Sequence, residues 1–190
     1  IFPVTKKIPT EYNGTVELTY YNGKKMLNSA HTNYSYDSLQ RILKFGLTKV
    51  DLTNVNSVLL LGLGGGSVIK TLREDFDFSG TVTAVELDKT IIDIAETEFQ
   101  VHSDSKLKII CNDAFEFVNN NQQLFDLIII DLFIDNLVPD VFYSTQFWEK
   151  ISKAIRKSGW FIFNASVISD ADDRLTPIMA VTENFFLIHK

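Results

Sequence analysis

The chain has 190 residues, of which 45% are hydrophobic and 22% charged, and this composition excludes a disordered or fibrous protein. Its length suits one domain with a small appendage. The net charge of −6 argues against nucleic-acid binding, which depends on Lys and Arg. The single cysteine, Cys111, excludes an intramolecular disulfide and a Cys-based zinc cluster. We see no run of eighteen apolar residues, so we expect no membrane span and a cytoplasmic location.

The first fifty residues predict a β-hairpin followed by a helix. Thr15–Tyr20 alternates polar and apolar side chains, Asn22-Gly23 is a strong turn signal, and Lys25–Asn28 returns as the second strand. Asp37 is then expected to cap a helix that Gly46 closes.

From residue 57 onward, short apolar strands alternate with amphipathic helices. The predicted strands are Ser57–Leu61, Thr81–Val85, Leu107–Cys111, Phe125–Ile130, Trp160–Ala165 and Phe185–Ile188. The predicted helices are Ser67–Arg73, Lys89–Phe99, Asp113–Phe117, Phe142–Arg156 and Asp172–Glu183. This pattern predicts an α/β, Rossmann-like fold with a mostly parallel sheet and helices on both faces. We expect it to occupy residues 51–190, after an N-terminal hairpin and helix region over residues 1–50.

Glycines or carboxylates follow the first four strands of this predicted sheet. In open α/β sheets, ligands bind beyond the carboxyl ends of the strands, so these residues are expected to meet around one site. They are Gly62, Gly64, Gly65 and Gly66 after the first strand, Glu86-Leu87-Asp88 after the second, Asn112-Asp113-Ala114 after the third and Asp131 after the fourth.

These residue types suit a nucleoside. Glu86 lies 24 residues after Gly62, which is close to the spacing at which a carboxylate accepts the hydroxyls of a ribose. Asp113 is placed to accept from an adenine amino group, and Leu87, Ala114 and Phe115 to line the ring. Asp131 would face the reacting centre. The plainer alternative is that Glu86, Asp88 and Asp113 cap helices and that the glycines form only a tight turn.

The glycine loop narrows the kind of nucleotide. A dinucleotide site prefers Gly or Ala where this chain has Ser67, and the loop lacks the lysine of a triphosphate site. Carboxylates near the reacting centre favour an adenosyl group on a cationic sulfonium, by Coulomb attraction. A nicotinamide-dependent oxidoreductase remains an alternative on the strength of the loop and Glu86.

At this point the chain resembles the class I S-adenosylmethionine-dependent methyltransferase fold and, within it, the spermidine synthase (polyamine aminopropyltransferase) family. The resemblance covers most of residues 15–165, and its motifs are 58–66 (VLLLGLGGG), 85–88 (VELD), 112–115 (NDAF) and 125–131 (FDLIIID). It implies a transferase of polyamine biosynthesis that uses S-adenosylmethionine or its decarboxylated form as donor co-substrate, with no metal. The acceptor would be a small amine or another small molecule. Many members are dimers, which is compatible with a homodimer here.

The resemblance implies Asp131 as the group that takes or orients the proton of the attacking amine, and Asp135 as the anchor of a second amine. Two positions depart from the family pattern: Gly65 replaces an Asp of the glycine loop, and Asp135 is displaced by one residue from the family's second carboxylate. Within this resemblance, three hypotheses therefore stay open: aminopropyl transfer, methyl transfer to a small molecule on the same fold, and a catalytically degenerate adenosyl-binding protein.

Overall fold

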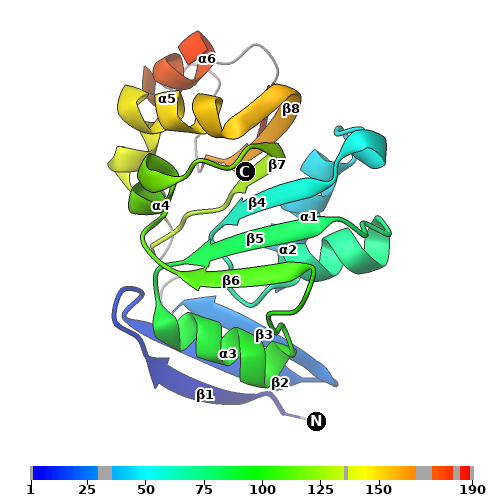
Figure 1. The fold of residues 1–190 in the computed structure, drawn as a ribbon. Helices are drawn as coiled ribbons and strands as arrows, with labels where there is room; N and C mark the ends of the chain where they lie inside the picture. Colours follow the sequence, from blue (N-terminus) through cyan, green and yellow to red (C-terminus); the bar gives the residue numbers. More distant parts are fainter. Residues whose placement is uncertain (1, 30–35, 135–136, 166–172, 182–184, 189–190) are drawn as a thin grey trace.

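The computed structural model describes residues 2–29, 36–134, 137–165, 173–181 and 185–188 (Figure 1). The N-terminal part is a three-stranded antiparallel sheet of β1 (Val4–Pro9), β2 (Thr15–Tyr21) and β3 (Lys24–Ser29), in that order. The predicted hairpin is β2 and β3, and both turn residues have positive φ, 48° at Asn22 and 76° at Gly23. Sequence reasoning missed β1, whose side chains are nearly all exposed.

The second sheet has six parallel strands, which confirms the predicted α/β fold. They are β4 (Ser57–Leu61), β5 (Thr81–Glu86), β6 (Leu107–Cys111), β7 (Phe125–Ile130), β8 (Ile155–Asn164) and β9 (Phe185–Ile188). Their order in space is β6-β5-β4-β7-β8-β9. The chain first adds strands on one side of β4, as far as β6, and then on its other side, from β7 to β9, so the strand order switches between β4 and β7. Such a switch point opens a crevice at the carboxyl ends of the strands.

Helices cover both faces of this sheet. They are α1 (Tyr36–Leu47), α2 (Ser67–Lys70), α3 (Lys89–Phe99), α4 (Ala114–Asn120), α5 (Thr145–Ala154) and α6 (Thr176–Val181). Alternate residues of β4 point to opposite faces: Val58 and Leu60 join a core with α1, α2 and α3, whereas Leu59 and Leu61 join a core with α4, α5 and α6. The continuous apolar run of β4 therefore reflects burial on both sides.

The predicted helix over Phe142–Arg156 was wrong in its bounds. A 3-10 turn over Asp140–Tyr143 comes first, and the Ser144 hydroxyl then accepts from the Phe147 amide (3.3 Å) as the cap of α5. Apolar side chains on both sides of Ser144 match helical spacing, which hid the break from the sequence pattern.

The strand expected to start near Gly159 begins earlier. Ile155 already pairs with Phe125, and the register shifts before Trp160 pairs with Leu127. Ser158 lies in this irregular stretch and has a φ of 70°. The first part of β8 therefore contains a bulge, in a stretch where the sequence predicted no strand.

Two smaller boundaries also moved. α1 starts at Tyr36, before the predicted cap Asp37, and continues through Gly46. The helix predicted over Ser67–Arg73 is α2 followed by a π-helical turn over Thr71–Asp75.

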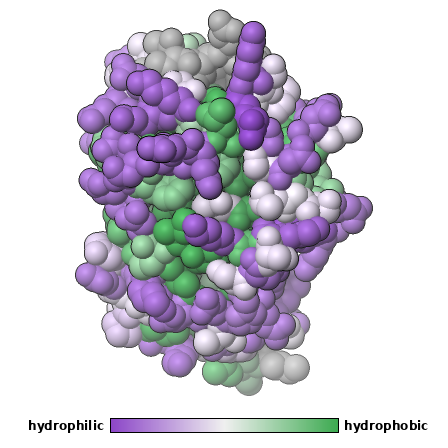
Figure 2. Space-filling view, in the orientation of Figure 1, coloured by the Kyte–Doolittle hydropathy of each residue, from purple (hydrophilic) through white to green (hydrophobic). Residues whose placement is uncertain are grey.

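The surface is hydrophilic over most of the visible face, with apolar surface gathered between α4 and α3 (Figure 2). No helix in the described ranges combines the length and apolar character needed to span a membrane.

Candidate functional site

A cavity of about 320 Å³ lies at the carboxyl ends of β4 to β7, between the parallel sheet and the N-terminal sheet. Its volume lies in the range usual for small-molecule sites. The predicted site residues that line it are Gly62, Gly64, Gly65, Glu86, Leu87, Asp113, Ala114 and Asp131. Gly66 is not among the lining residues, and Asp135 lies outside the described residues.

Gly62 lets the ends of β4 and β7 lie side by side. Its φ is +92°, and a Cβ there would fall 2.1 Å from the carbonyl oxygen of Asp131. The Asp131 amide donates to Leu61 O (2.8 Å), so the ladder between the strands continues to this point. The absence of a side chain at Gly62 is thus what allows Asp131 to sit beside the glycine loop.

The two last glycines of the loop have different surroundings. Gly66 takes a left-handed conformation at the start of α2, and a Cβ there would fall 2.5 Å from Val101 Cγ2. Gly66 therefore serves close packing. Gly65 lines the cavity, and a Cβ there would lie 3.4 Å from the Phe99 ring.

Glu86 holds the glycine loop as well as facing the cavity. Its Oε2 accepts from the amides of Leu63 (3.0 Å) and Gly64 (3.2 Å), and its Oε1 accepts from the Asp88 amide (3.1 Å). Burial raises the pKa of Glu86, although these three hydrogen bonds act to lower it. Oε1 retains capacity to accept from a bound hydroxyl.

Asp113 caps a helix and also lines the cavity. Its Oδ1 accepts from the Glu116 amide (2.9 Å) and caps α4, while its Oδ2 accepts no hydrogen bond from the described residues. Leu87 and Ala114 line the cavity as expected. Phe115 does not: its ring stacks on Phe147, with centroids 6.0 Å apart.

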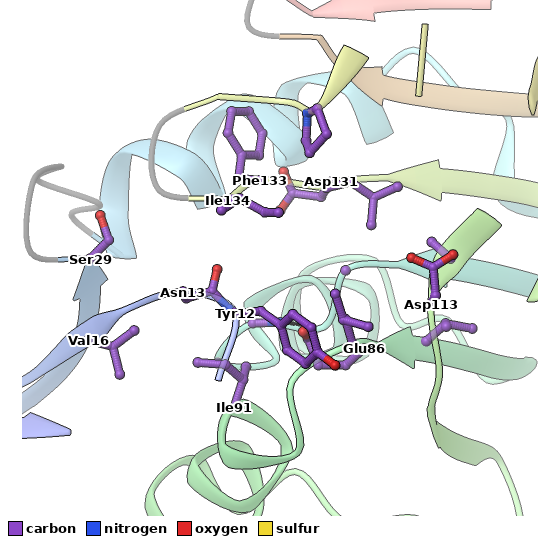
Figure 3. Close-up of a pocket in the computed structure, with 18 of the residues that line it drawn as sticks. Tyr12, Asn13, Val16, Ser29, Glu86, Ile91, Asp113, Asp131, Phe133 and Ile134 are labelled. Carbon is purple, nitrogen blue, oxygen red and sulfur yellow. Dashed lines mark hydrogen bonds between the residues drawn. The ribbon is translucent and has the colours of Figure 1, made fainter. Parts of the chain in front are cut away.

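Asp131 lies near the middle of the cavity, on the side opposite Glu86 and Tyr12 (Figure 3). Asn164, at the end of β8, donates from Nδ2 to Asp131 Oδ1 (2.9 Å), which orients the carboxylate. Apolar side chains after Asp131 complete this wall: Leu132, Phe133, Ile134, Pro139, Val141 and Phe142. Asp113 and the pair Val16 and Ser29 mark opposite ends of the cavity (Figure 3).

Sequence reasoning missed the residues that the N-terminal sheet adds. Tyr12 and Asn13 come from the turn between β1 and β2, and Val16, Leu27, Asn28 and Ser29 come from β2 and β3. The alternation in β2 signals that Val16 is buried, but nothing in the sequence shows that it faces this cavity.

The curated relatives include two kinds of transferase. An "eEF1A lysine and N-terminal methyltransferase" of Xenopus laevis is 30% identical over 145 residues, which cover 70% of this chain and 20% of that protein. A "probable polyamine aminopropyl transferase" of Bifidobacterium longum is 26% identical over 129 residues, which cover 68% of this chain and 28% of that protein. The chain thus spans less than a third of the length of each of these two relatives.

Solved structures share the fold. A probable spermidine synthase from Corynebacterium glutamicum superposes with a TM-score of 0.65 at 20% identity, covering 95% of this chain and 68% of that one. Human methyltransferase-like protein 13, solved in complex with SAH, superposes with a TM-score of 0.60 at 20% identity, covering 77% of this chain and 72% of that one.

The family model for the spermine/spermidine synthase domain matches residues 23–186, which include strand β3, the glycine loop and the cavity residues Glu86, Asp113 and Asp131. The chain therefore belongs to the spermine/spermidine synthase domain family.

Proposed function

We propose that this protein is a transferase that uses S-adenosylmethionine or its decarboxylated form as donor and a small amine, or another small molecule, as acceptor. The observation that carries the proposal is the gathering of Glu86, Asp113 and Asp131 with the glycine loop around one cavity. Family membership and the names of the relatives point to the same chemistry.

The adenosine half of the donor fits between Glu86 and Asp113. Oε1 of Glu86 has capacity to accept from a ribose hydroxyl, and Oδ2 of Asp113 to accept from an adenine amino group. Leu87, Ala114 and Ile91 supply apolar surface for the base and the sugar. The carboxylates also attract a cationic sulfonium, because a charge in a low-dielectric cleft is poorly screened.

Asp131 is proposed to bind the acceptor amine and take its proton. The donor would supply an electrophilic carbon bonded to a positively charged sulfur; the amine nitrogen would form a bond to this carbon as the carbon–sulfur bond breaks, and the sulfur would leave as a neutral thioether. An amine attacks only when it is neutral, and a carboxylate within hydrogen-bond reach both holds the ammonium form and accepts its proton. The Asn164 hydrogen bond keeps Asp131 in one orientation, which fixes where the amine lies.

Methyl transfer is the second candidate, and Gly65 favours it. This position of the glycine loop carries no carboxylate, so it adds no negative charge that would repel the carboxylate of intact S-adenosylmethionine. The Xenopus laevis relative is by name a methyltransferase.

Calorimetry with S-adenosylmethionine, decarboxylated S-adenosylmethionine and methylthioadenosine tests the proposal. We expect binding of at least one donor, followed by a mass-detected product when putrescine and other small amines are added. Tighter binding of the decarboxylated donor with putrescine turnover supports aminopropyl transfer, and tighter binding of the intact donor supports methyl transfer. Donor binding without turnover across the amines supports the degenerate protein, and no binding of any of the three compounds rules out the adenosyl site.

Four expectations from the sequence remain proposals. They are the second-amine role of Asp135, the division of the chain near residue 50, the homodimer and the cytoplasmic location.

A further inference from the structure

Asp88 is a buried carboxylate for which donor binding, as proposed above, gives no role. It has no exposed surface, and among the described residues the other buried polar side chains are Thr71 and Asn164. A carboxylate withdrawn from water is costly unless hydrogen bonds replace the lost hydration. The hydrogen bonds of Asp88 therefore show which parts of the structure the buried carboxylate stabilises.

The two oxygens of Asp88 serve two different elements. Oδ1 accepts from the Thr90 amide (2.9 Å) and caps α3, as the sequence suggested. Oδ2 accepts from the Tyr12 amide (3.1 Å) and from Asn13 Nδ2 (3.4 Å), which lie in the turn between β1 and β2. Burial acts to raise the pKa of Asp88, but the hydrogen bonds from Tyr12, Thr90 and their neighbours outweigh it and hold the pKa below its ordinary value. The turn is thus held by a charged acceptor, which makes stronger hydrogen bonds than a neutral one.

The turn that Asp88 holds has a defined shape of its own. The Thr10 amide donates to Gly14 O (2.6 Å), and the Asn13 amide donates to Thr10 Oγ1 (3.0 Å). Gly14 has a φ of +64°, which suits the tight reversal. Because the turn is internally bonded, fastening it at Tyr12 and Asn13 places the whole of residues 10–14.

The turn over residues 10–14 forms a wall of the cavity that Glu86, the carboxylate proposed to bind the donor's ribose, also lines. Tyr12 and Asn13 line the cavity together with Glu86 and Ile91 (Figure 3). The Asp88 amide also donates to Glu86 Oε1, so Glu86, the glycine loop and the turn are joined through one three-residue segment. A displacement of the turn would therefore open the cavity at the donor end.

We propose that Asp88 is a positioning residue whose buried carboxylate fastens the turn over residues 10–14 to the start of α3 and so holds Tyr12 and Asn13 as a wall of the donor half of the cleft. This inference rests on the proposed function, since it concerns the same site. In this proposal Oδ2 of Asp88 holds the turn and so helps the cleft to keep the donor bound, whereas Oδ1 caps α3.

The variant Asp88→Ser separates the two roles. Serine caps helices about as well as aspartate, but its single oxygen cannot serve both Thr90 and the turn. We expect the Kd and KM for the donor to rise by about 10- to 150-fold, the range that accompanies loss of a hydrogen bond to a charged group, while kcat stays near the wild-type value. Hydrogen exchange should become faster at amides 10–14 and stay slow at the start of α3.

Two variants serve as controls. Glu98→Gln weakens another attachment of the same sheet to α3, at the helix end away from the cavity, where Lys25 Nζ contacts Glu98 Oε2 (3.0 Å). Asp126→Asn removes a carboxylate that accepts from the amides of Asn56 and Ser57. These residues lie at the amino ends of β4 and β7, whereas the cavity lies at the carboxyl ends. Both should leave donor affinity near that of the wild type.

Donor affinity in Asp88→Ser equal to that of the wild type would overturn the inference, as would an equal loss in either control. If the wild-type protein binds no donor, the proposed function fails, and the exchange data alone decide whether Asp88 fastens the turn. Unchanged exchange at residues 10–14 in Asp88→Ser would show that it does not.

Discussion

The two sheets contribute to the same cavity but are held in place in different ways. The six-stranded sheet is buried on both faces, and Val58, Leu59, Leu60 and Leu61 of β4 have no exposed surface or almost none. The three-stranded sheet has one nearly bare strand, β1. Val16 and Leu18 of its middle strand β2 are buried in the same core as α3, and polar contacts at Asp88 and Glu98 attach the sheet to the two ends of that helix.

This difference separates two kinds of site residue. Glu86 is the last residue of β5, and Asp131 directly follows β7. Both strands pair with β4, so the hydrogen-bonded ladder sets the relative position of the two carboxylates. Tyr12 and Asn13 depend instead on how the N-terminal sheet docks, through their hydrogen bonds to Asp88 and the packing of β2 on the core. Changes to the strand ends should therefore destroy the site, whereas changes to the attachments should loosen it.

The largest effect is expected from Gly62→Ala. The new Cβ would fall 2.1 Å from the backbone of Asp131, and neither strand end has a flexible atom to move aside. We expect a loss of more than about 4 kcal/mol in the free energy of unfolding, measured by urea titration, together with loss of donor binding.

The matched change is Gly64→Ala. Gly64 also has a positive φ of +52°, but a Cβ there would meet no atom within 4 Å. Only the backbone strain remains, about 1–2 kcal/mol. Equal losses in the two variants would show that backbone strain, and not the contact with Asp131, determines the requirement at Gly62.

Asp131→Asn should separate catalysis from donor binding. An amide cannot accept the proton of the acceptor amine, so we expect kcat to fall about 10²- to 10⁴-fold in a product assay, with donor affinity measured by calorimetry almost unchanged. Asp113→Asn should show the opposite pattern, with weaker donor binding and little change in kcat. A kcat for Asp131→Asn close to that of the wild type would exclude the proton-acceptor role.

Acid should weaken the parallel sheet through Asp126. Hydrogen bonds from Ser57 and Asn56 and the charge of Arg156 outweigh the effect of burial and lower the pKa of Asp126. A carboxylate whose pKa is lower in the folded state stabilises the fold above its unfolded-state pKa, and this stability is lost as the pH falls through the folded-state value. The loss should therefore begin below about pH 4, the ordinary value for Asp.

Asp126→Asn should lower the free energy of unfolding at pH 7 by about 1–3 kcal/mol and flatten its decline in acid. Glu149→Gln, at an exposed position on α5, should change it by less than about 0.5 kcal/mol. The comparison is made by urea unfolding between pH 7 and pH 3. A variant as acid-sensitive as the wild type would assign the acid response to other groups.

Much of the parallel sheet could be predicted because local pattern and tertiary burial agree there. Both β7 and α3 have the bounds predicted from the sequence, and the apolar residues of α3 are buried as expected. β1 was missed because exposed strands carry no apolar alternation. The break at Ser144 was missed because apolar spacing continued across it.

The candidate site likewise combines residues that could be predicted from the sequence with residues that could not. Glu86, Asp113 and Asp131 could be brought together from the sequence, because parallel strands end at one edge of a sheet. Tyr12 and Asn13 could not, since their position depends on how an antiparallel sheet docks on a helix 76 residues further along the chain. Asp88 was recognised as a cap, but only the structure shows what its second oxygen holds.

The smallest effect is expected at the other attachment of the N-terminal sheet. Lys25 Nζ donates to the carbonyl of Glu98 (2.9 Å) and to its side chain, and Tyr20 donates to the same carboxylate (2.6 Å). The ion pair is partly exposed, with 38% and 25% of the two side chains accessible, so water and salt screen it.

Glu98→Gln should therefore cost only about 0.2–1 kcal/mol in urea unfolding, and the loss should shrink further in high salt. Exchange of amides in β2 should quicken slightly, while amides 10–14 keep their protection because Asp88 still holds them. A loss of protection at residues 10–14 equal to that in Asp88→Ser would mean that the sheet docks on α3 as one rigid unit. In that case the two ends of α3 could not be assigned separate roles, and the wall of the cavity would depend on both.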